Sequence, residues 1–445
     1  MYKIRIEKAK NLNEYEELIK IFLPPGDYQL SEDGEAGLAY RVQDDKDEVK
    51  RRLYDDLAEI TGKRPPWGIL TGIRPIKLTG ELLRETGSVA ETRRRLREHY
   101  RISREKTDLA LEIYQRQVKA FARPPQDSAG IYIGIPFCPT RCLYCSFASN
   151  QVDDSEIARY FTALQQEITQ VGRMMRDRGI EAESLYVGGG TPTSLSAQQM
   201  AEMLQQVREE IPSSRIREIT VEAGRPDTIT GDKLAAMHRA GVTRISINPQ
   251  TMNDRTLVRI GREHTAAQVD QAFAMAREEG FEVINMDLIA GLPGEESADF
   301  AETLEKIISL GPENITVHSL AVKRASRLAE ADREYHYSHG ELVSRMLEYA
   351  RNSLREHGYQ PYYLYRQKHM SGAQENTGYC LPGSESLYNV RIMDEHQHII
   401  AMGAGGISKV YFPRENRLQR VPNVTNYQIY IERIEEMIRR KQNAY

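Results

Sequence analysis

The chain has 445 residues, and its 40% hydrophobic and 28% charged residues are typical of a globular protein with a sizeable core. A formal net charge of −4 gives no electrostatic reason to expect nucleic acid or an anionic membrane surface as a partner. No stretch approaches the roughly 18 apolar residues of a transmembrane helix, and the first residues lack a signal-peptide core. We therefore expect a cytoplasmic protein without a membrane span.

The first 125 residues read as a separate α+β module. The pattern predicts two strands and three helices, over 2–6, 38–42, 45–61, 76–99 and 104–121. The run Arg123-Pro124-Pro125 is a plausible linker to the next domain. No catalytic spacing occurs in this segment, so the sequence predicts no role for it.

From residue 126 to 335 short strands alternate with helices. Strands are expected at 131–135, 184–187, 218–222, 243–247, 282–288 and 314–319, and helices at 154–177, 196–210, 230–240, 265–279 and 297–309. Such alternation predicts an α/β fold with a parallel sheet and right-handed crossovers, either doubly wound or an incomplete barrel. The unusual residues follow the ends of several strands, which favours a partial (β/α)6 barrel resembling a TIM barrel.

After residue 335 the alternation fades. The segment 336–445 is expected to form a smaller α+β extension that packs on the barrel and covers its mouth. Its predicted elements are a helix at 339–357, a tyrosine-rich stretch at 359–365, the run 399–412 and a terminal helix at 424–441.

Three of the four cysteines, Cys138, Cys142 and Cys145, lie within GIPFCPTRCLYCSF (134–147) in the spacing C-x3-C-x2-C. Structural zinc usually has four protein ligands, and neither a second cysteine pair nor a histidine lies in this loop. A disulfide is disfavoured in a reducing cytosol. The pattern favours a [4Fe–4S] cluster, with zinc and a metal-free loop as the alternatives.

Thiolates normally bind all four irons of such a cluster, so three cysteines leave one iron able to bind an outside molecule. S-adenosylmethionine (SAM) suits this position, because its amino and carboxylate groups can chelate iron. The sequence GGGTPT (188–193) follows the second predicted strand of the barrel and allows main-chain N–H groups to approach a ligand. An isolated triple glycine would indicate only a tight turn.

Together these motifs resemble the radical SAM superfamily and, within it, the oxygen-independent coproporphyrinogen III oxidase (HemN-like) group. The resemblance runs from about residue 132 to 407 and includes IPFC, GGGTPT and MDLIAGLPGE (286–295). The long N-terminal module and CPTRCLYCSF are most similar to the HemZ-type coproporphyrinogen dehydrogenase branch. The resemblance implies contacts to the cluster-bound SAM from Tyr132, Gly189, Gly190, Thr191 and Glu222, and to a second SAM from Tyr144, Gln250, Arg262, Asp287, Ala321 and Ile407.

The resemblance also implies an activity. A deoxyadenosyl radical would remove hydrogen from propionate side chains of coproporphyrinogen III, and loss of an electron and of carbon dioxide would leave vinyl groups, giving protoporphyrinogen IX for haem biosynthesis. A reductant such as flavodoxin or ferredoxin would supply electrons. Three basic residues follow the sixth strand, Lys323, Arg324 and Arg327. They would suit propionate carboxylates, and the alternative is that they are solvated loop charges without a ligand. His318 faces the cavity or belongs to the core.

One position departs from the oxidase pattern. The well-studied oxidase has a further cysteine two positions after the third cluster ligand, where this chain has Phe147. The related HemW-like group lacks that cysteine and binds haem as a chaperone without the oxidase reaction. The alternatives to the oxidase are therefore a haem-binding chaperone and a HemN-like radical SAM methyltransferase.

Overall fold

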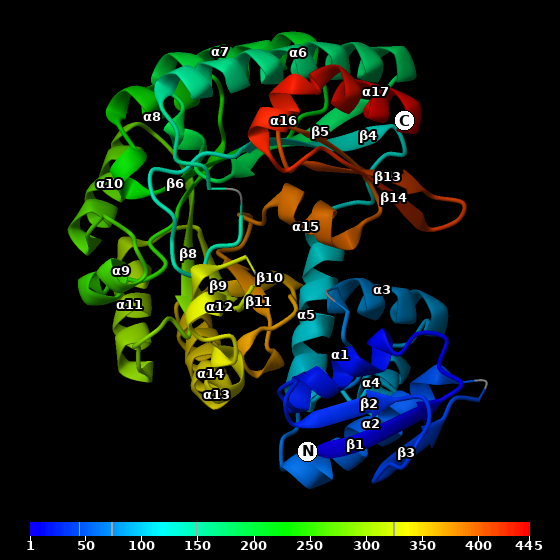
Figure 1. Cartoon of the computed structure of the whole chain (residues 1–445). Coiled ribbons are helices and arrows are strands. Elements are labelled where there is room, and N and C mark those ends of the chain that lie inside the picture. The colour runs from blue at the N-terminus through cyan, green and yellow to red at the C-terminus, as the bar shows by residue number, and fades with distance from the viewer. Residues whose placement is uncertain (44, 73, 148, 324) are drawn as a thin grey trace.

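The computed structural model describes residues 1–43, 45–72, 74–147, 149–323 and 325–445. Within them an 11-stranded sheet has the order β10-β11-β9-β8-β7-β6-β5-β4-β12-β13-β14, and a separate three-stranded sheet has the order β2-β1-β3. Figure 1 shows the large sheet curved inside a layer of helices, with the small sheet in a lobe at the N-terminus.

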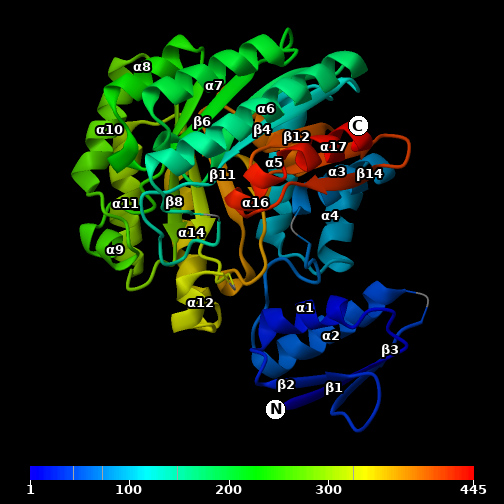
Figure 2. The same cartoon turned by 45° about the horizontal axis from the view of Figure 1, so that its top comes forward.

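The small sheet consists of three parallel strands, β1 (Tyr2–Glu7), β2 (Tyr28–Ser31) and β3 (Leu38–Arg41). Alternate residues of β1, Ile4 and Ile6, are fully buried in one cluster with residues of α1 (Asn13–Phe22) and α2 (Lys46–Thr61). Figure 2 shows both helices on the same side of this sheet. The sequence pattern predicted β1, β3 and α2, but it missed β2 and α1.

The predicted helix over 76–99 is in fact two helices, α3 (Pro75–Thr86) and α4 (Val89–Glu98), and α5 (Arg104–Ala120) follows. Gly87 ends α3 with a φ of +63°, and the Ser88 side chain caps α4 by accepting a hydrogen bond from the Glu91 N–H. These helices bury Trp67 in a second cluster that also contains Leu364 of the large sheet. Residues 1–125 therefore contain two hydrophobic clusters, and the second continues into β10 (Gln360–Tyr365) of the large sheet.

The six predicted βα units are present, and their parallel strands lie side by side in chain order. The strands are β4 (Ser128–Ile135), β5 (Glu181–Gly189), β6 (Glu218–Gly224), β7 (Arg244–Ile247), β8 (Val283–Ala290) and β9 (Asn314–Ser319). The covering helices are α6 (Asp154–Arg178), α7 (Ala197–Glu210), α8 (Gly231–Arg239), α10 (Ala266–Glu278) and α11 (Ser297–Leu310). A short helix that the pattern missed, α9 (Asp254–Arg259), precedes α10.

The two faces of these strands differ in chemistry. Ile133, Val187 and Val221 are fully buried in one hydrophobic cluster with residues of the covering helices. The alternate positions, such as Tyr132 and Glu222, are polar and half-buried. An apolar outer face and a polar inner face are what a curved sheet around a site requires, and the predicted partial barrel is confirmed.

The C-terminal region extends the sheet at both edges. Antiparallel β11 (Asn376–Cys380) and β10 (Gln360–Tyr365) continue it beyond β9. Parallel β12 (His398–Met402), followed by β13 (Ile407–Phe412) and β14 (Arg417–Pro422), continues it beyond β4. The remaining helices are α12 (Arg327–Ala331), α13 (Tyr335–Ser338), α14 (Gly340–Glu356), α15 (Leu387–Asp394), α16 (Tyr427–Glu432) and α17 (Ile434–Ala444).

Helix α15 packs at the end of the barrel opposite to the one we expected the extension to cover. The Glu218 carboxylate, at the first residue of β6, accepts hydrogen bonds from the N–H groups of Leu387 (2.7 Å) and Tyr388 (3.0 Å). Arg391 forms two 2.9 Å hydrogen bonds to Glu183 near the start of β5. These carboxylates hold the helix because they complement its N-terminal dipole and its arginine.

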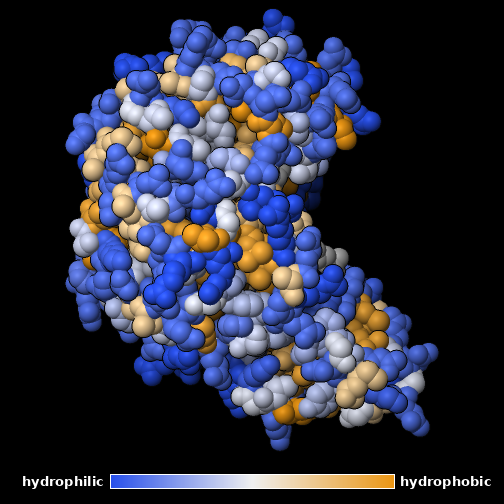
Figure 3. Space-filling view, turned by 60° about the vertical axis from the view of Figure 1, so that its left-hand side comes forward, coloured by the Kyte–Doolittle hydropathy of each residue, from blue (hydrophilic) through white to orange (hydrophobic). Residues whose placement is uncertain are grey.

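No helix among the described residues combines the length and apolarity needed to cross a membrane. On the face in Figure 3, hydrophilic side chains predominate and hydrophobic ones occur in small groups.

Candidate active site

The cysteine loop (residues 136–150) connects β4 to α6 and begins at the C-terminal end of β4. Cys142 is buried, whereas Cys138 and Cys145 are partly exposed, and all three are free thiols. The Cys138 N–H donates to the Asn150 carbonyl (3.1 Å), which joins the two ends of the loop. The thiols thus emerge from a loop whose base is closed by main-chain hydrogen bonds.

The far side of the cysteine loop is held by loops from other βα units. The Leu143 N–H donates to the Ile260 carbonyl after α9, and the Leu143 carbonyl accepts from the Leu328 N–H of α12, each at 2.9 Å. The Thr140 hydroxyl donates to the Gly261 carbonyl at 3.1 Å. The position of the cysteines therefore depends on the loops that follow β7 and β9.

The three thiols form the donor set of this loop. Burial raises the pKa of the Cys138 thiol to about 11, although a hydrogen bond from the Thr191 hydroxyl (3.4 Å) opposes the shift. Burial also raises the pKa of Cys145. Among the described residues, no group of three or more His, Cys, Asp or Glu side chains is arranged to hold a single metal ion. Three thiols without a nitrogen or carboxylate partner fit a cluster, in which each thiolate binds its own iron, better than mononuclear zinc.

The glycine turn (residues 188–190) packs against the cysteine loop. The Gly190 N–H donates to the Ile135 carbonyl at 2.7 Å, and a Cβ atom at Gly190 would lie 2.5 Å from the Phe137 carbonyl oxygen and 2.9 Å from Cys138 Sγ. Gly189 has a φ of +115°, a conformation that residues with side chains rarely adopt. Only glycine therefore fits this turn beside the cysteines.

Gly188 lets the Tyr186 ring and the Glu222 carboxylate pack closely against the main chain on the inner face of the sheet. A Cβ atom there would lie 2.9 Å from the Tyr186 ring and 3.1 Å from Glu222 Oε1. The Tyr186 hydroxyl donates a 2.5 Å hydrogen bond to Glu222. The pKa of Glu222 is raised to about 7. Burial is the largest cause, the Tyr186 hydrogen bond acts in the opposite direction, and the charge of Asp287 adds to the increase. A small polar ligand group on this face would meet the Glu222 carboxyl.

Three tyrosine rings line the inner face between α15 and the cysteine loop. The rings of Tyr186 and Tyr388 stack with centroids 4.7 Å apart, and those of Tyr132 and Tyr186 with centroids 6.3 Å apart. The sequence analysis singled out Tyr132 but missed the other two. The alternation of β5 places Tyr186 on the same face as Gly188, which was a usable signal, whereas nothing local indicated Tyr388.

Arg262 links the cysteine loop to the end of β7. Its Nη1 donates to the Tyr144 hydroxyl at 3.3 Å and lies 4.0 Å from Cys142 Sγ, and its Nη2 donates to the Asn248 carbonyl at 2.6 Å. Burial and the charge of Cys142 raise the pKa of Tyr144, whereas Arg262 lowers it. The structure thus brings Tyr144 and Arg262 together beside a cysteine.

Asp287 belongs to a polar network on β8 and β9. Its Oδ2 lies 3.5 Å from Nε2 of His318, and its Oδ1 accepts a 2.8 Å hydrogen bond from Asn285. Burial raises the pKa of Asp287, but the contacts from His318 and Asn285 outweigh it and the net shift is downward. Tyr365 of β10 reaches His318 Nδ1 at 3.3 Å. His318 therefore faces the inner side of the barrel. The sequence alone did not decide between this position and one in the core.

The other residues that the resemblance indicated lie at the same end of the strands but differ in setting. The Gln250 N–H donates to the Asp287 carbonyl at 2.9 Å, with Gln250 at a φ of +69°. Ala321 pairs with Met370. Ile407 begins β13, which β12 separates from β4, and its side chain is 47% exposed. Arg324 lies outside the described residues.

Comparisons with known proteins place these features in a family. The model of the radical SAM superfamily matches residues 132–307. The oxygen-independent coproporphyrinogen-III oxidase-like protein HemZ of Bacillus subtilis is 42% identical over 84% of this chain and 76% of its own length. The heme chaperone HemW of the same organism is 32% identical over 62% of this chain and 69% of its own length.

Among solved structures, coproporphyrinogen III oxidase (HemN) from Escherichia coli, described as a radical SAM enzyme, superimposes with a TM-score of 0.56 at 24% identity over 72% of each chain. This likeness establishes the fold alone. Superfamily membership implies a [4Fe–4S] cluster and SAM as cofactors. Because the chain is 42% identical to HemZ over 84% of its length, it belongs to the radical SAM superfamily and, within it, to the HemN-like group.

Proposed function

We propose that the chain catalyses the oxygen-independent oxidative decarboxylation of two propionate side chains of coproporphyrinogen III to vinyl groups, giving protoporphyrinogen IX. One observation carries the proposal: the cysteine loop, the glycine turn and the polar inner face of β4–β9 meet at the C-terminal ends of the parallel strands, where barrel enzymes have their active sites. The name of the HemZ relative supports the same reaction class.

In this proposal Cys138, Cys142 and Cys145 hold the [4Fe–4S] cluster. When bound, the cluster supplies the electron for reductive cleavage of SAM, and flavodoxin or ferredoxin supplies that electron in turn. The main chain of Gly189, Gly190 and Thr191 contacts the amino and carboxylate groups of SAM, a role that membership of the radical SAM superfamily suggests for this turn. Tyr132 and Glu222 complete this site on the inner face.

A second SAM would lie beside the first. The residues proposed for it are Tyr144, Gln250, Arg262, Asp287, Ala321 and Ile407. Arg262 and Tyr144 touch each other next to Cys142, and Gln250 bonds to the main chain of Asp287. Tyr144 thus lies in the loop after β4, Gln250 and Arg262 lie in the segment after β7, and Asp287 lies on β8.

The substrate would enter between these loops and the N-terminal module. Lys323 and Arg327, which follow β9, suit the propionate carboxylates, and burial lowers the pKa of Lys323. Helix α15 covers the other end of the barrel. The proposed division is a module over 1–125, the barrel over 126–335 and the extension over 336–445.

A haem-binding chaperone is the second candidate, because the cysteine loop carries Phe147 where the oxidase has a further cysteine. The Phe147 side chain is 68% exposed beside the cluster ligands, and the HemW relatives are named heme chaperones. An exposed aromatic side chain suits the face of a tetrapyrrole.

One experiment separates the two candidates. The chain is reconstituted anaerobically with iron and sulfide, given reductant and SAM, and assayed for 5′-deoxyadenosine and for vinyl products with and without coproporphyrinogen III. The oxidase proposal expects vinyl formation that depends on the substrate. Cleavage of SAM without a vinyl product, together with tight stoichiometric haem binding, would reject the oxidase in favour of the chaperone.

A further inference from the structure

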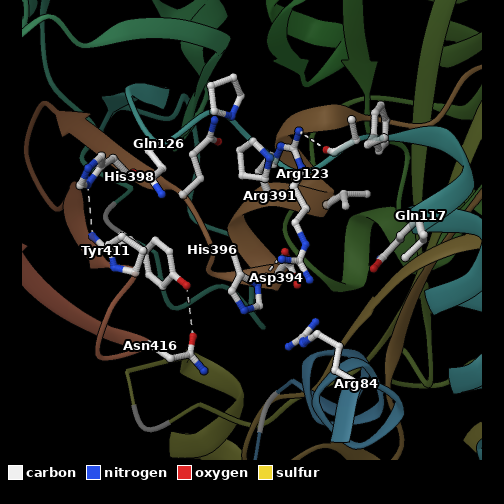
Figure 4. Close-up of a pocket in the computed structure, with 18 of the residues that line it drawn as sticks. Arg84, Gln117, Arg123, Gln126, Arg391, Asp394, His396, His398, Tyr411 and Asn416 are labelled. Atoms are coloured by element: carbon white, nitrogen blue, oxygen red, sulfur yellow. Dashed lines mark hydrogen bonds and ion pairs between the residues drawn. The ribbon is translucent and has the colours of Figure 1, made fainter. Parts of the chain in front are cut away.

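A second polar cavity lies away from the cysteines, between the N-terminal helices and the C-terminal part of the large sheet. Its volume is about 530 Å³, within the range of small-molecule sites, and Figure 4 shows its lining residues. The lining comes from α3 and α5, from the segment 121–126, from α15 and from β12 and β13. Because α15 packs against the starts of β5 and β6, this cavity is at the opposite end of the barrel from the cysteine loop.

The charge of this cavity is predominantly positive. Arg84, Arg123 and Arg391 line it, and Asp394 contacts His396 Nδ1 at 2.8 Å. Arg391 is matched by Glu183, but Arg84 and Arg123 form no ion pair with any residue that the structure describes. Two guanidinium groups in one cavity without carboxylate partners are a recognisable anion site.

The two unpaired arginines line the same cavity as Tyr411. Burial and Asp394 raise the pKa of the Tyr411 hydroxyl, and the positive charges of Arg84 and Arg123 lower it. Figure 4 shows Tyr411 and His396 in the same cavity as Arg84 and Arg123. Arg84 and Arg123 precede His396 and Tyr411 by at least 273 residues in the sequence, and the fold brings them together.

A buried amide adds a second, independent sign of a ligand. Gln397 lines the cavity and is 3% exposed, and its Nε2 donates to Ser128 Oγ and to Glu183 Oε2, both at 2.7 Å. Its Oε1 is buried without a hydrogen-bond partner among the described residues. An unsatisfied buried acceptor destabilises the folded chain, so a hydrogen-bond donor supplied by a ligand would be favoured.

We propose that this cavity binds an anionic small molecule whose oxyanion groups contact Arg84 and Arg123 and which also offers a hydrogen-bond donor to the amide of Gln397. Phosphates of a nucleotide and carboxylates of a tetrapyrrole both provide this chemistry. The ligand contacts the N-terminal helices and the barrel together. It also lies next to α15, whose Tyr388 ring stacks on Tyr186, the donor to Glu222. The site is separate from the cysteines.

The test uses the full chain without added cluster, so that it does not depend on the proposed reaction. Binding of ATP, of coproporphyrin III and of uncharged adenosine is measured by equilibrium dialysis for the wild type, for the double variant Arg84→Ala/Arg123→Ala and for a control, Arg173→Ala/Arg239→Ala. The control changes two exposed arginines on α6 and α8. All the arginines involved are exposed, and matched thermal unfolding of the three chains verifies that they fold.

We expect one anion, either ATP or coproporphyrin III, to bind the wild type and the control at one site per chain, and the double variant to lose at least tenfold in affinity. Preference for ATP identifies a phosphate ligand, and preference for coproporphyrin III identifies a carboxylate ligand. The proposal is overturned if neither anion binds the wild type, if adenosine binds equally well, or if the double variant keeps the wild-type affinity.

Discussion

The Tyr186 hydroxyl donates a 2.5 Å hydrogen bond to the Glu222 carboxylate, directly below the glycine turn that packs on the cysteine loop. The two side chains come from neighbouring strands, and both pack against Gly188, where a Cβ atom would lie 2.9 Å from Tyr186 and 3.1 Å from Glu222. The carboxyl that the proposed SAM site uses is therefore positioned by a tyrosine that itself stacks on α15.

Glu222 should make the stability of the chain depend on pH. Burial raises its pKa from 4.5 to about 7, so between these values the folded chain binds more protons than the unfolded chain and loses stability as the pH rises. The Glu222→Gln variant has no carboxyl to titrate at this position, so it does not lose this stability as the pH rises. The stability of the variant relative to the wild type should therefore increase across this window, by at most about 1.4 kcal/mol per pH unit. Urea unfolding at a series of pH values tests this, and a difference independent of pH would contradict it.

Gly190→Ala should prevent cluster incorporation. Its Cβ would lie 2.5 Å from the Phe137 carbonyl oxygen and 2.9 Å from Cys138 Sγ, and because the first contact is with main chain, the cysteine loop must move. The matched control is Gly231→Ala at the start of α8, where a Cβ meets nothing within 4 Å. Iron content after anaerobic reconstitution is the measurement. Equal iron in the two variants would show that the close contact is unimportant.

Arg262→Lys should remove the second SAM while leaving the first. A lysine has one terminal nitrogen and cannot contact both Tyr144 and the Asn248 carbonyl as the guanidinium does. Equilibrium dialysis of SAM against the reconstituted chain should give a stoichiometry of about two for the wild type and about one for the variant, on the two-SAM model. A stoichiometry that the substitution leaves unchanged would remove Arg262 from the proposed site.

Glu375→Ala should destabilise the chain strongly. Glu375 is 4% exposed and accepts hydrogen bonds from Trp67 Nε1 (2.8 Å) and Lys106 Nζ (2.6 Å). Its removal leaves the buried Trp67 Nε1 without this acceptor and leaves Lys106 with only the partly exposed Glu105 carboxylate at 3.5 Å, at a cost of about 3–5 kcal/mol. Glu105→Ala, which removes a carboxylate with a 50% exposed side chain, should cost about 0–1 kcal/mol. Denaturant unfolding of both variants measures the difference, and equal costs would contradict the prediction.

The sequence predicted the barrel well because its signals are local. All six strands of the βα units carry short apolar runs, and polar residues such as Glu222 and Asp287 stand near strand ends. The break between α3 and α4 was also readable, since Ser88 and Glu91 have the spacing of a helix cap, but the helical periodicity on both sides obscured it.

The features that the sequence did not predict depend on contacts between distant residues. The stack of Tyr388 on Tyr186 and the bond from Trp67 to Glu375, 308 residues apart, arise only when the sheet has closed. The same is true of the placement of α15, since Glu218 and Glu183 gave no local sign that they would hold a helix. Long-range polar contacts of this kind have no periodic signal in a single sequence.

The most direct test of the central claim is the iron and sulfide content of the anaerobically reconstituted chain, compared with that of Cys138→Ala, Cys142→Ala and Cys145→Ala. We expect about four irons and four sulfides per wild-type chain, with the absorbance of a [4Fe–4S] cluster, and a large loss in each variant. A wild-type chain that stays free of iron after reconstitution, or that binds only zinc, would contradict the account.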